Sequence, residues 1–86
     1  MEGRRLYWLT YSRAGEPIGV VIIRSVSLVD APMRVALDGL DDGVDFGEGH
    51  KLDPKRARLV TRQEIGRMLS IEEANRLLRR LEANAK

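Results

Sequence analysis

Two segments near the N-terminus carry bulky, β-prone side chains at nearly every position. Aliphatic and aromatic side chains predominate in residues 6–12, and residues 18–25 contain an unbroken run of four β-branched side chains. Between them, Gly15 tolerates a positive φ and Pro17 cannot donate to a strand ladder. This pattern predicts a β-hairpin with strands at about residues 6–12 and 18–25.

The next apolar positions recur at helical spacing over residues 30–40. Ser27 or Asp30 can accept hydrogen bonds from the first free amides of a helix, and Pro32 restricts where the regular helix begins. Gly39 favours a stop near residue 40. We therefore predict a helix at about residues 30–40.

Residues 41–50 show no period and contain three glycines and four acids, which is typical of a surface loop. Residues 50–52 could add a short third strand to the hairpin. Asp53 and Pro54 form a typical start of a helix or turn, with the aspartate as the cap. Residues 55–60 fit either a single turn or an extended segment.

Two capping boxes stand in the C-terminal third, where a hydroxyl residue precedes a glutamate by three positions. They begin at Thr61 and Ser70. The apolar stripes that follow them would face opposite sides of one continuous helix, so the pattern predicts a break between two helices. We expect helices at about residues 62–69 and 71–84, and an α+β fold in which both pack on one face of the sheet.

The composition fits one small domain over residues 1–86 in a compartment that is reducing. The chain has 86 residues and no cysteine, which removes disulfides, thiolate nucleophiles and cysteine-based zinc sites. The N-terminus lacks the apolar stretch of a signal peptide, and no apolar run approaches the roughly 20 residues of a membrane-spanning helix. We expect a cytoplasmic protein with no membrane contact.

Charge is segregated along the chain although the net charge is only +2. Residues 1–29 carry four basic and two acidic side chains, residues 30–50 one and six, and residues 51–86 ten and five. Such segregation suits either internal complementarity or a contact surface for another molecule. A small core also gains stability from a partner, so a homo-oligomer or another protein partner is expected.

The side chains best suited to catalysis or metal binding do not form a catalytic or metal-binding pattern. The acidic segment from Asp38 to His50 fails the calcium-loop spacing, because Leu40 and Gly49 stand where ligands are required. His50 is the single histidine, and no serine lies in a nucleophile elbow. We predict no enzyme activity, no metal, no cofactor and no small-molecule substrate.

Two sets of residues are candidates for contact with nucleic acid or a protein partner. Alternation places Arg5, Tyr7, Tyr11 and Arg13 on one face of the first strand, where tyrosines could stack on bases or simply pair across strands. The second set is a cluster of basic residues in the C-terminal half of the chain: Lys55, Arg56, Arg58, Arg62 and Arg67. This cluster suits phosphate contact and equally suits docking on the acidic residues 38–48 of the same chain.

Two resemblances to known proteins bear on these functional predictions. Residues 63–66 and 70–71 resemble the first helix and turn of a helix-turn-helix, but Arg76 and Arg79 fall where the recognition helix normally carries apolar residues. Residues 7–11, 49–53 and 65–70 resemble a group of short bacterial proteins of unknown function, which implies a free-standing module and no particular activity. The sequence thus favours a non-enzymatic interaction module, which associates with itself or with another protein, over a nucleic-acid-binding module.

Overall fold

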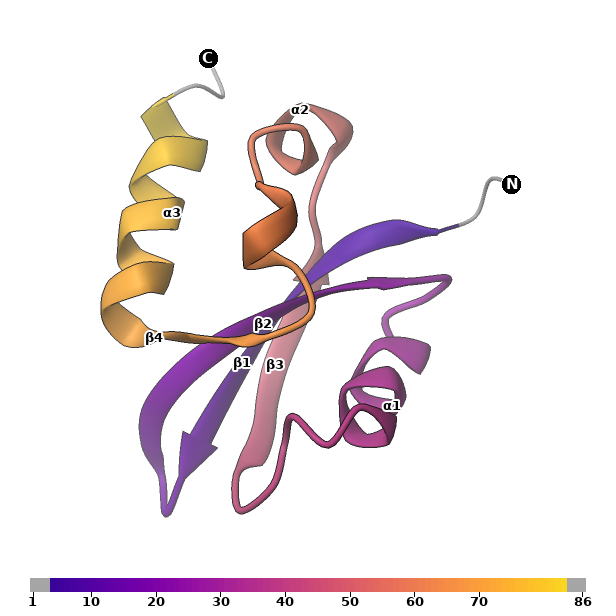
Figure 1. The fold of residues 1–86 in the computed structure, drawn as a ribbon, viewed down its shortest axis with the longest axis vertical. Helices are drawn as coiled ribbons and strands as arrows, with labels where there is room; N and C mark the ends of the chain where they lie inside the picture. Colours follow the sequence, from indigo (N-terminus) through magenta and orange to yellow (C-terminus); the bar gives the residue numbers. More distant parts are fainter. Residues whose placement is uncertain (1–3, 84–86) are drawn as a thin grey trace.

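The computed structural model describes residues 4–83 and has an α+β fold (Figure 1). Four strands form one antiparallel sheet in the order β3-β1-β2-β4, and helices cover both of its faces. The α+β class expected from the sequence is confirmed. None of the helices within residues 4–83 is long and apolar enough to cross a membrane.

The hairpin of β1 (Arg5–Arg13) and β2 (Glu16–Ser25) forms the centre of the sheet. Its turn places Ala14 and Gly15 at positive φ, of 51° and 84°. A bulge between Tyr11 and Ser12 shifts the pairing near the turn. Both strands are longer than their apolar runs, because the polar residues that flank the turn also pair.

The prediction of a loop over residues 41–50 is wrong, because β3 (Asp45–Lys51) pairs with β1 over most of this segment. A bulge lies opposite Thr10, whose hydroxyl accepts from the Glu48 N–H and donates to the Glu48 carbonyl oxygen, both at 3.1 Å. At Gly49 an added Cβ would lie 2.5 Å from a methyl group of Leu9. Close approach to β1 therefore explains a glycine in a strand, which propensity alone disfavours.

The helix α1 (Asp30–Leu37) follows a turn that the Ser27 hydroxyl holds. The Ser27 hydroxyl accepts from the Asp30 N–H at 3.0 Å, and the Asp30 carboxylate accepts from Ser25 Oγ at 2.8 Å and Arg34 Nε at 2.7 Å. These hydrogen bonds, from Ser25 first and then Arg34, hold the pKa of Asp30 below its usual value. The helix ends at Leu37, three residues before the expected stop.

The helix expected at residues 62–69 is also wrong. The short helix α2 (Pro54–Ala57), capped by Asp53, leads into the 3-10 turn η1 (Arg62–Glu64) and then into the strand β4 (Met68–Ser70). Gly66 has a φ of +82° and donates its N–H to the carbonyl oxygen of Ile22 at 2.7 Å. This bond to β2 ends the turn, and the chain then pairs with β2 as an edge strand.

The C-terminal helix α3 (Ile71–Ala83) begins directly after Ser70, as the second capping box predicts. The Ser70 hydroxyl accepts from the Glu73 N–H at 3.1 Å, and Glu73 accepts from the Ser70 N–H at 2.9 Å. The expected last residue, Asn84, lies outside the described residues. Only one of the two helices expected in this third of the chain is therefore present.

The sheet separates two apolar cores (Figure 1). One lies under α3 and includes Leu6 and Trp8 of β1, while the other lies under α1 and includes Tyr7 and Leu9. The strand β1 is therefore buried on both faces. The expected packing of two C-terminal helices on a single face is not confirmed, because residues 62–69 form a 3-10 turn and part of a strand in place of a helix.

Candidate functional site

The aromatic face expected on the first strand is not exposed. Tyr7 and Tyr11 are 6% and 2% exposed, because they pack in the core under α1, where they share a cluster with Val35 of that helix. Burial and the negative charge of Asp41 raise the pKa of Tyr11 to about 12. These tyrosines are therefore not available to stack on bases, and this part of the expected contact surface is corrected.

The expected basic residues do not form one surface. Three of them are engaged within the chain: Arg13 with the Gly43 carbonyl oxygen (3.3 Å), Arg56 with Asp53 (4.0 Å) and Arg67 with Glu73 (2.9 Å). The side chains of Lys55 and Arg62 are exposed, with no hydrogen bond or ion pair to any described residue. Arg5 and Arg58 are the two that the fold brings together.

Arg5 and Arg58 line one cavity of about 260 Å³, which Arg4 and Arg24 complete. We call these four residues and the cavity the arginine pocket. Its arginines come from the start of β1, the end of β2 and the C-terminal end of α2. Sequence reasoning missed Arg4 and Arg24, although a lone arginine after a run of four β-branched residues was a signal for Arg24.

The acidic segment does not gather into a metal site. Within residues 4–83, no three acidic or histidine side chains lie close enough to share a metal ion. The His50 ring stacks on the Trp8 ring, with 6.4 Å between the centroids and 22° between the planes. His50 is therefore explained by cross-strand packing between β3 and β1.

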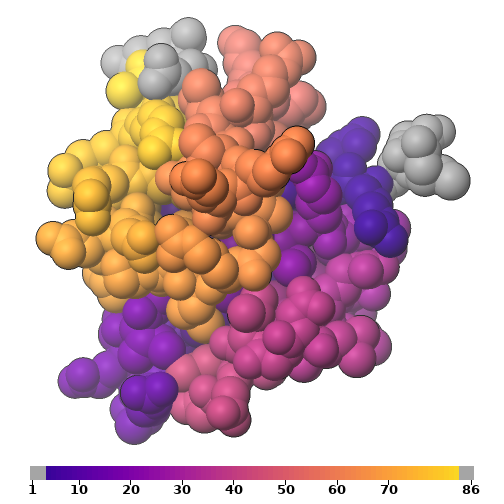
Figure 2. Space-filling view, in the orientation of Figure 1, coloured from indigo at the N-terminus to yellow at the C-terminus, as the bar shows by residue number. Residues whose placement is uncertain are grey.

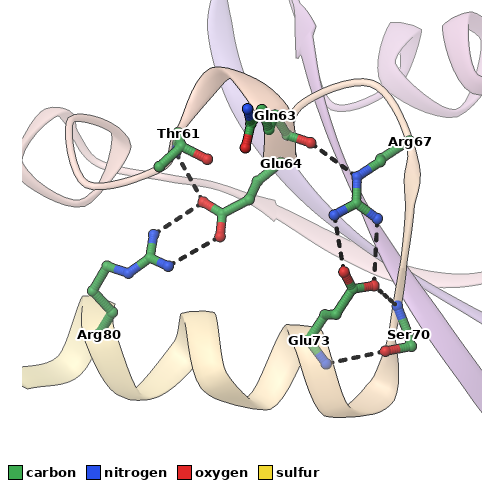
Figure 3. Close-up of polar contacts among 7 residues, drawn as sticks. All are labelled: Thr61, Gln63, Glu64, Arg67, Ser70, Glu73 and Arg80. Atoms are coloured by element: carbon green, nitrogen blue, oxygen red, sulfur yellow. Dashed lines mark hydrogen bonds and ion pairs between the residues drawn. The ribbon is translucent and has the colours of Figure 1, made fainter.

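A network of polar contacts fastens the segment 61–70 to α3 (Figure 3). Arg67 donates to both carboxylate oxygens of Glu73, at 3.3 and 2.9 Å, and to the Gln63 carbonyl oxygen at 2.9 Å. The bonds from Arg67 and from the Ser70 backbone lower the pKa of Glu73 to about 2. This network shapes the fold, since its charges satisfy one another.

A second bidentate ion pair, between Arg80 and Glu64, belongs to the same network. Burial raises the pKa of Glu64, but hydrogen bonds from Arg80 and Thr61 outweigh it, so the pKa lies below its usual value. The Thr61 N–H donates to Glu64 at 2.8 Å. The first capping box is therefore in place, although it caps a 3-10 turn instead of the expected α-helix.

The outer face of α1 carries exposed apolar side chains. Val29, Met33 and Leu37 are 81%, 60% and 84% exposed, and we call these three the α1 stripe. At 100° per residue they point roughly 180° away from the buried pair Ala31 and Val35. Figure 2 shows the segment of α1, in magenta, at the surface of the molecule. Val26 and Leu28 before the helix are also exposed, by 55% and 42%.

Comparison with protein-family models, curated proteins and solved structures finds no match to this chain. Function has to be argued from the geometry of the chain itself. Two surface features stand out within residues 4–83: the exposed apolar α1 stripe and the arginine pocket.

Proposed function

We propose that this chain is a non-enzymatic interaction module that self-associates through the outer face of α1. The observation that carries the proposal is the α1 stripe: three large apolar side chains, each at least 60% exposed, aligned on the helix face opposite the core. A helix that is apolar on two opposite faces usually has a partner on each of them. The sheet occupies one face of α1, and the proposed partner is a second copy.

The spacing of the stripe suits a two-fold contact. In a symmetric pair the same patch meets itself, so a two-fold axis perpendicular to the helix would pass beside Met33. Val29 of each copy would then pack against Leu37 of the partner subunit. Val26 and Leu28 extend the apolar area beyond the helix start. A standard interface buries about 800 Å² per partner, roughly one seventh of the 5793 Å² surface of this chain.

The sheet edges suit self-association less well than α1 does. The edge strand β3 has a bulge, two glycines and the charged residues Asp45, Glu48 and Lys51. Bulges and charges on an edge strand discourage pairing with another chain. The other edge, β4, has only three residues. These features favour a helix-mediated contact over an extended sheet.

Nucleic-acid binding has weaker support. Its aromatic platform would need Tyr7 and Tyr11, which are buried, and Arg56 and Arg67 already pair with carboxylates. The remaining basic residues can contact phosphates, which supplies affinity without base specificity. Self-association therefore has the more specific structural basis.

Sedimentation velocity over a concentration series tests the proposal. The wild-type chain is expected to form a dimer, and the double variant Met33→Lys/Leu37→Lys is expected to remain a monomer, since two lysines on the stripe would repel their counterparts. The matched control is Leu78→Lys, which changes an exposed leucine of α3. A monomeric wild-type chain at the highest concentration, or a dimer that persists in the double variant, would overturn it.

A further inference from the structure

The arginine pocket has a cationic rim and an apolar floor. Arg4 and Arg5 lie at the start of β1 and Arg24 lies near the end of β2. Arg58 is the C-terminal cap of α2. Leu6 pairs with Arg24 across the hairpin. The apolar lining residues are Leu6, Ala57, Val60 and Ile65. Three separate segments of the chain thus bring guanidinium groups to one cavity.

No carboxylate of residues 4–83 lines this cavity. The side chains of Arg4, Arg24 and Arg58 make no hydrogen bond or ion pair with any residue of 4–83, and Arg5 donates only to the Arg4 carbonyl oxygen, at 3.2 Å. Arg4 helps to lower the pKa of Asp30, after the larger effects of Ser25 and Arg34, and Asp38 lines the neighbouring cavity with Arg24. The Asp30 carboxylate is already bonded to Ser25 and Arg34.

Elsewhere in the described part of the chain, four of the eight arginines pair with acids. The four such pairs are Arg34 with Asp30, Arg56 with Asp53, Arg67 with Glu73 and Arg80 with Glu64. The arginine pocket instead gathers four like charges, which repel one another. A bound anion would relieve this repulsion and occupy donors that the protein leaves free.

The chemistry of the pocket narrows the class of anion. Guanidinium groups bind phosphate in a bidentate manner, and a phosphate monoester offers about two negative charges and three acceptor oxygens. A cavity of about 260 Å³ accommodates one such group and a small organic part against the apolar floor. A long polyanion would instead use phosphate contacts spread along a surface.

We propose that the arginine pocket binds the phosphate group of a small phosphorylated molecule. The guanidinium groups hold the phosphate oxygens, and the apolar floor contacts the carbon skeleton of the ligand. This site goes beyond self-association, and of its four arginines only Arg24 shares a neighbouring cavity with the α1 stripe, through Leu37.

Amide chemical-shift titration at constant ionic strength tests the proposal. Phenyl phosphate and inorganic phosphate are the probes, and phenol and a short DNA duplex are the comparisons. We expect saturable one-to-one binding of both phosphates, tighter for phenyl phosphate, with the largest shifts around Arg5, Arg24 and Arg58. Phenol alone is expected to cause no saturable shift at these amides.

The variant Arg24→Gln/Arg58→Gln is expected to weaken phenyl phosphate binding at least about tenfold, because each lost bidentate contact removes charge-assisted hydrogen bonds. Its matched control is Arg76→Gln/Arg79→Gln, which removes the same charge from exposed positions of α3. Equal weakening in both variants, no saturable binding, or binding of the DNA duplex alone would overturn the proposal. Retained amide dispersion in both variants excludes unfolding as the cause.

Discussion

Arg80 donates two parallel hydrogen bonds to the Glu64 carboxylate, at 3.0 and 3.1 Å, and so ties η1 to the middle of α3 (Figure 3). The same guanidinium donates to the Leu59 carbonyl oxygen at 2.9 Å. One side chain thus contacts both Leu59, just after α2, and the last residue of η1. The segment between α2 and η1 has little regular structure of its own, so its path depends on that anchor.

The variant Glu64→Gln is therefore expected to lower the free energy of unfolding by about 1 kcal/mol, since the pair is bidentate but Arg80 is partly exposed. Urea denaturation measures the change. Glu82→Gln is the control, because Glu82 makes no ion pair with another described residue of the chain. Equal effects of the two substitutions would contradict the anchoring role of Glu64.

Acid is expected to destabilise the fold as the pH falls from about 5 towards 2. The pKa of Glu73 is about 2 in the folded chain, below its usual 4.5, because of hydrogen bonds from Arg67 and Ser70. A carboxyl group whose pKa is lower in the folded state stabilises that state when ionised. This stabilisation is complete above the unfolded pKa and is lost as the pH falls through the folded pKa. Urea denaturation over this pH range measures the loss.

The variant Glu73→Gln separates this contribution from the others. Its free energy of unfolding should lie below that of the wild type at neutral pH and approach it near pH 2. Glu72→Gln, on the exposed side of the same helical turn, should keep the wild-type slope. The same pH slope in Glu73→Gln and the wild type would show that the Arg67 contact contributes nothing.

Tyr11→Phe is expected to leave the free energy of unfolding unchanged or to raise it by about 1 kcal/mol. The Tyr11 hydroxyl is buried and has no hydrogen-bond partner among residues 4–83. Its removal therefore relieves the free-energy cost of burying an unpaired polar group. Tyr7→Phe serves as the comparison on the same face. Thermal or urea unfolding of the two variants measures the difference, and a clear loss in Tyr11→Phe alone would reveal a partner for that hydroxyl.

Gly19→Ala is expected to destabilise the contact between β2 and β4 by about 1–3 kcal/mol. An added Cβ would overlap the Leu69 carbonyl oxygen and would lie 3.0 Å from the Met68 sulfur. Hydrogen exchange should show faster exchange of the β4 amides, while the pairing of β1 with β3 stays protected. Uniform loss of protection across the sheet would argue against this local effect.

The sequence was informative where local chemistry decides the structure. The hairpin follows from the β-branched run and its turn, and the start of α3 follows from the Ser70 cap. Residues 62–69 misled because Ile65, Met68 and Leu69 fit a helical stripe, whereas Gly66 and its bond to β2 decide the conformation. Those determinants involve residues more than forty positions apart in the chain.

The surfaces were harder to predict for the same reason. Alternation along the first strand suggests one buried and one exposed face, but it cannot reveal that helices cover both. The arginine pocket joins residues 4, 5, 24 and 58, and only the pairing of β1 with β2 and the docking of α2 bring them together. The exposure of Met33 and Leu37 likewise depends on which face of α1 meets the sheet.

Burial of β1 on both faces has a consequence for the fidelity of folding. In a half-exposed strand, a slip by one residue would move apolar side chains into water and so would be penalised at once. Here such a slip would exchange the contents of two apolar cores, which hydrophobicity alone penalises far less. Correct alignment must therefore come from shape: the Thr10 hydroxyl fits the bulge at Glu48, and Gly19 admits the backbone of Leu69.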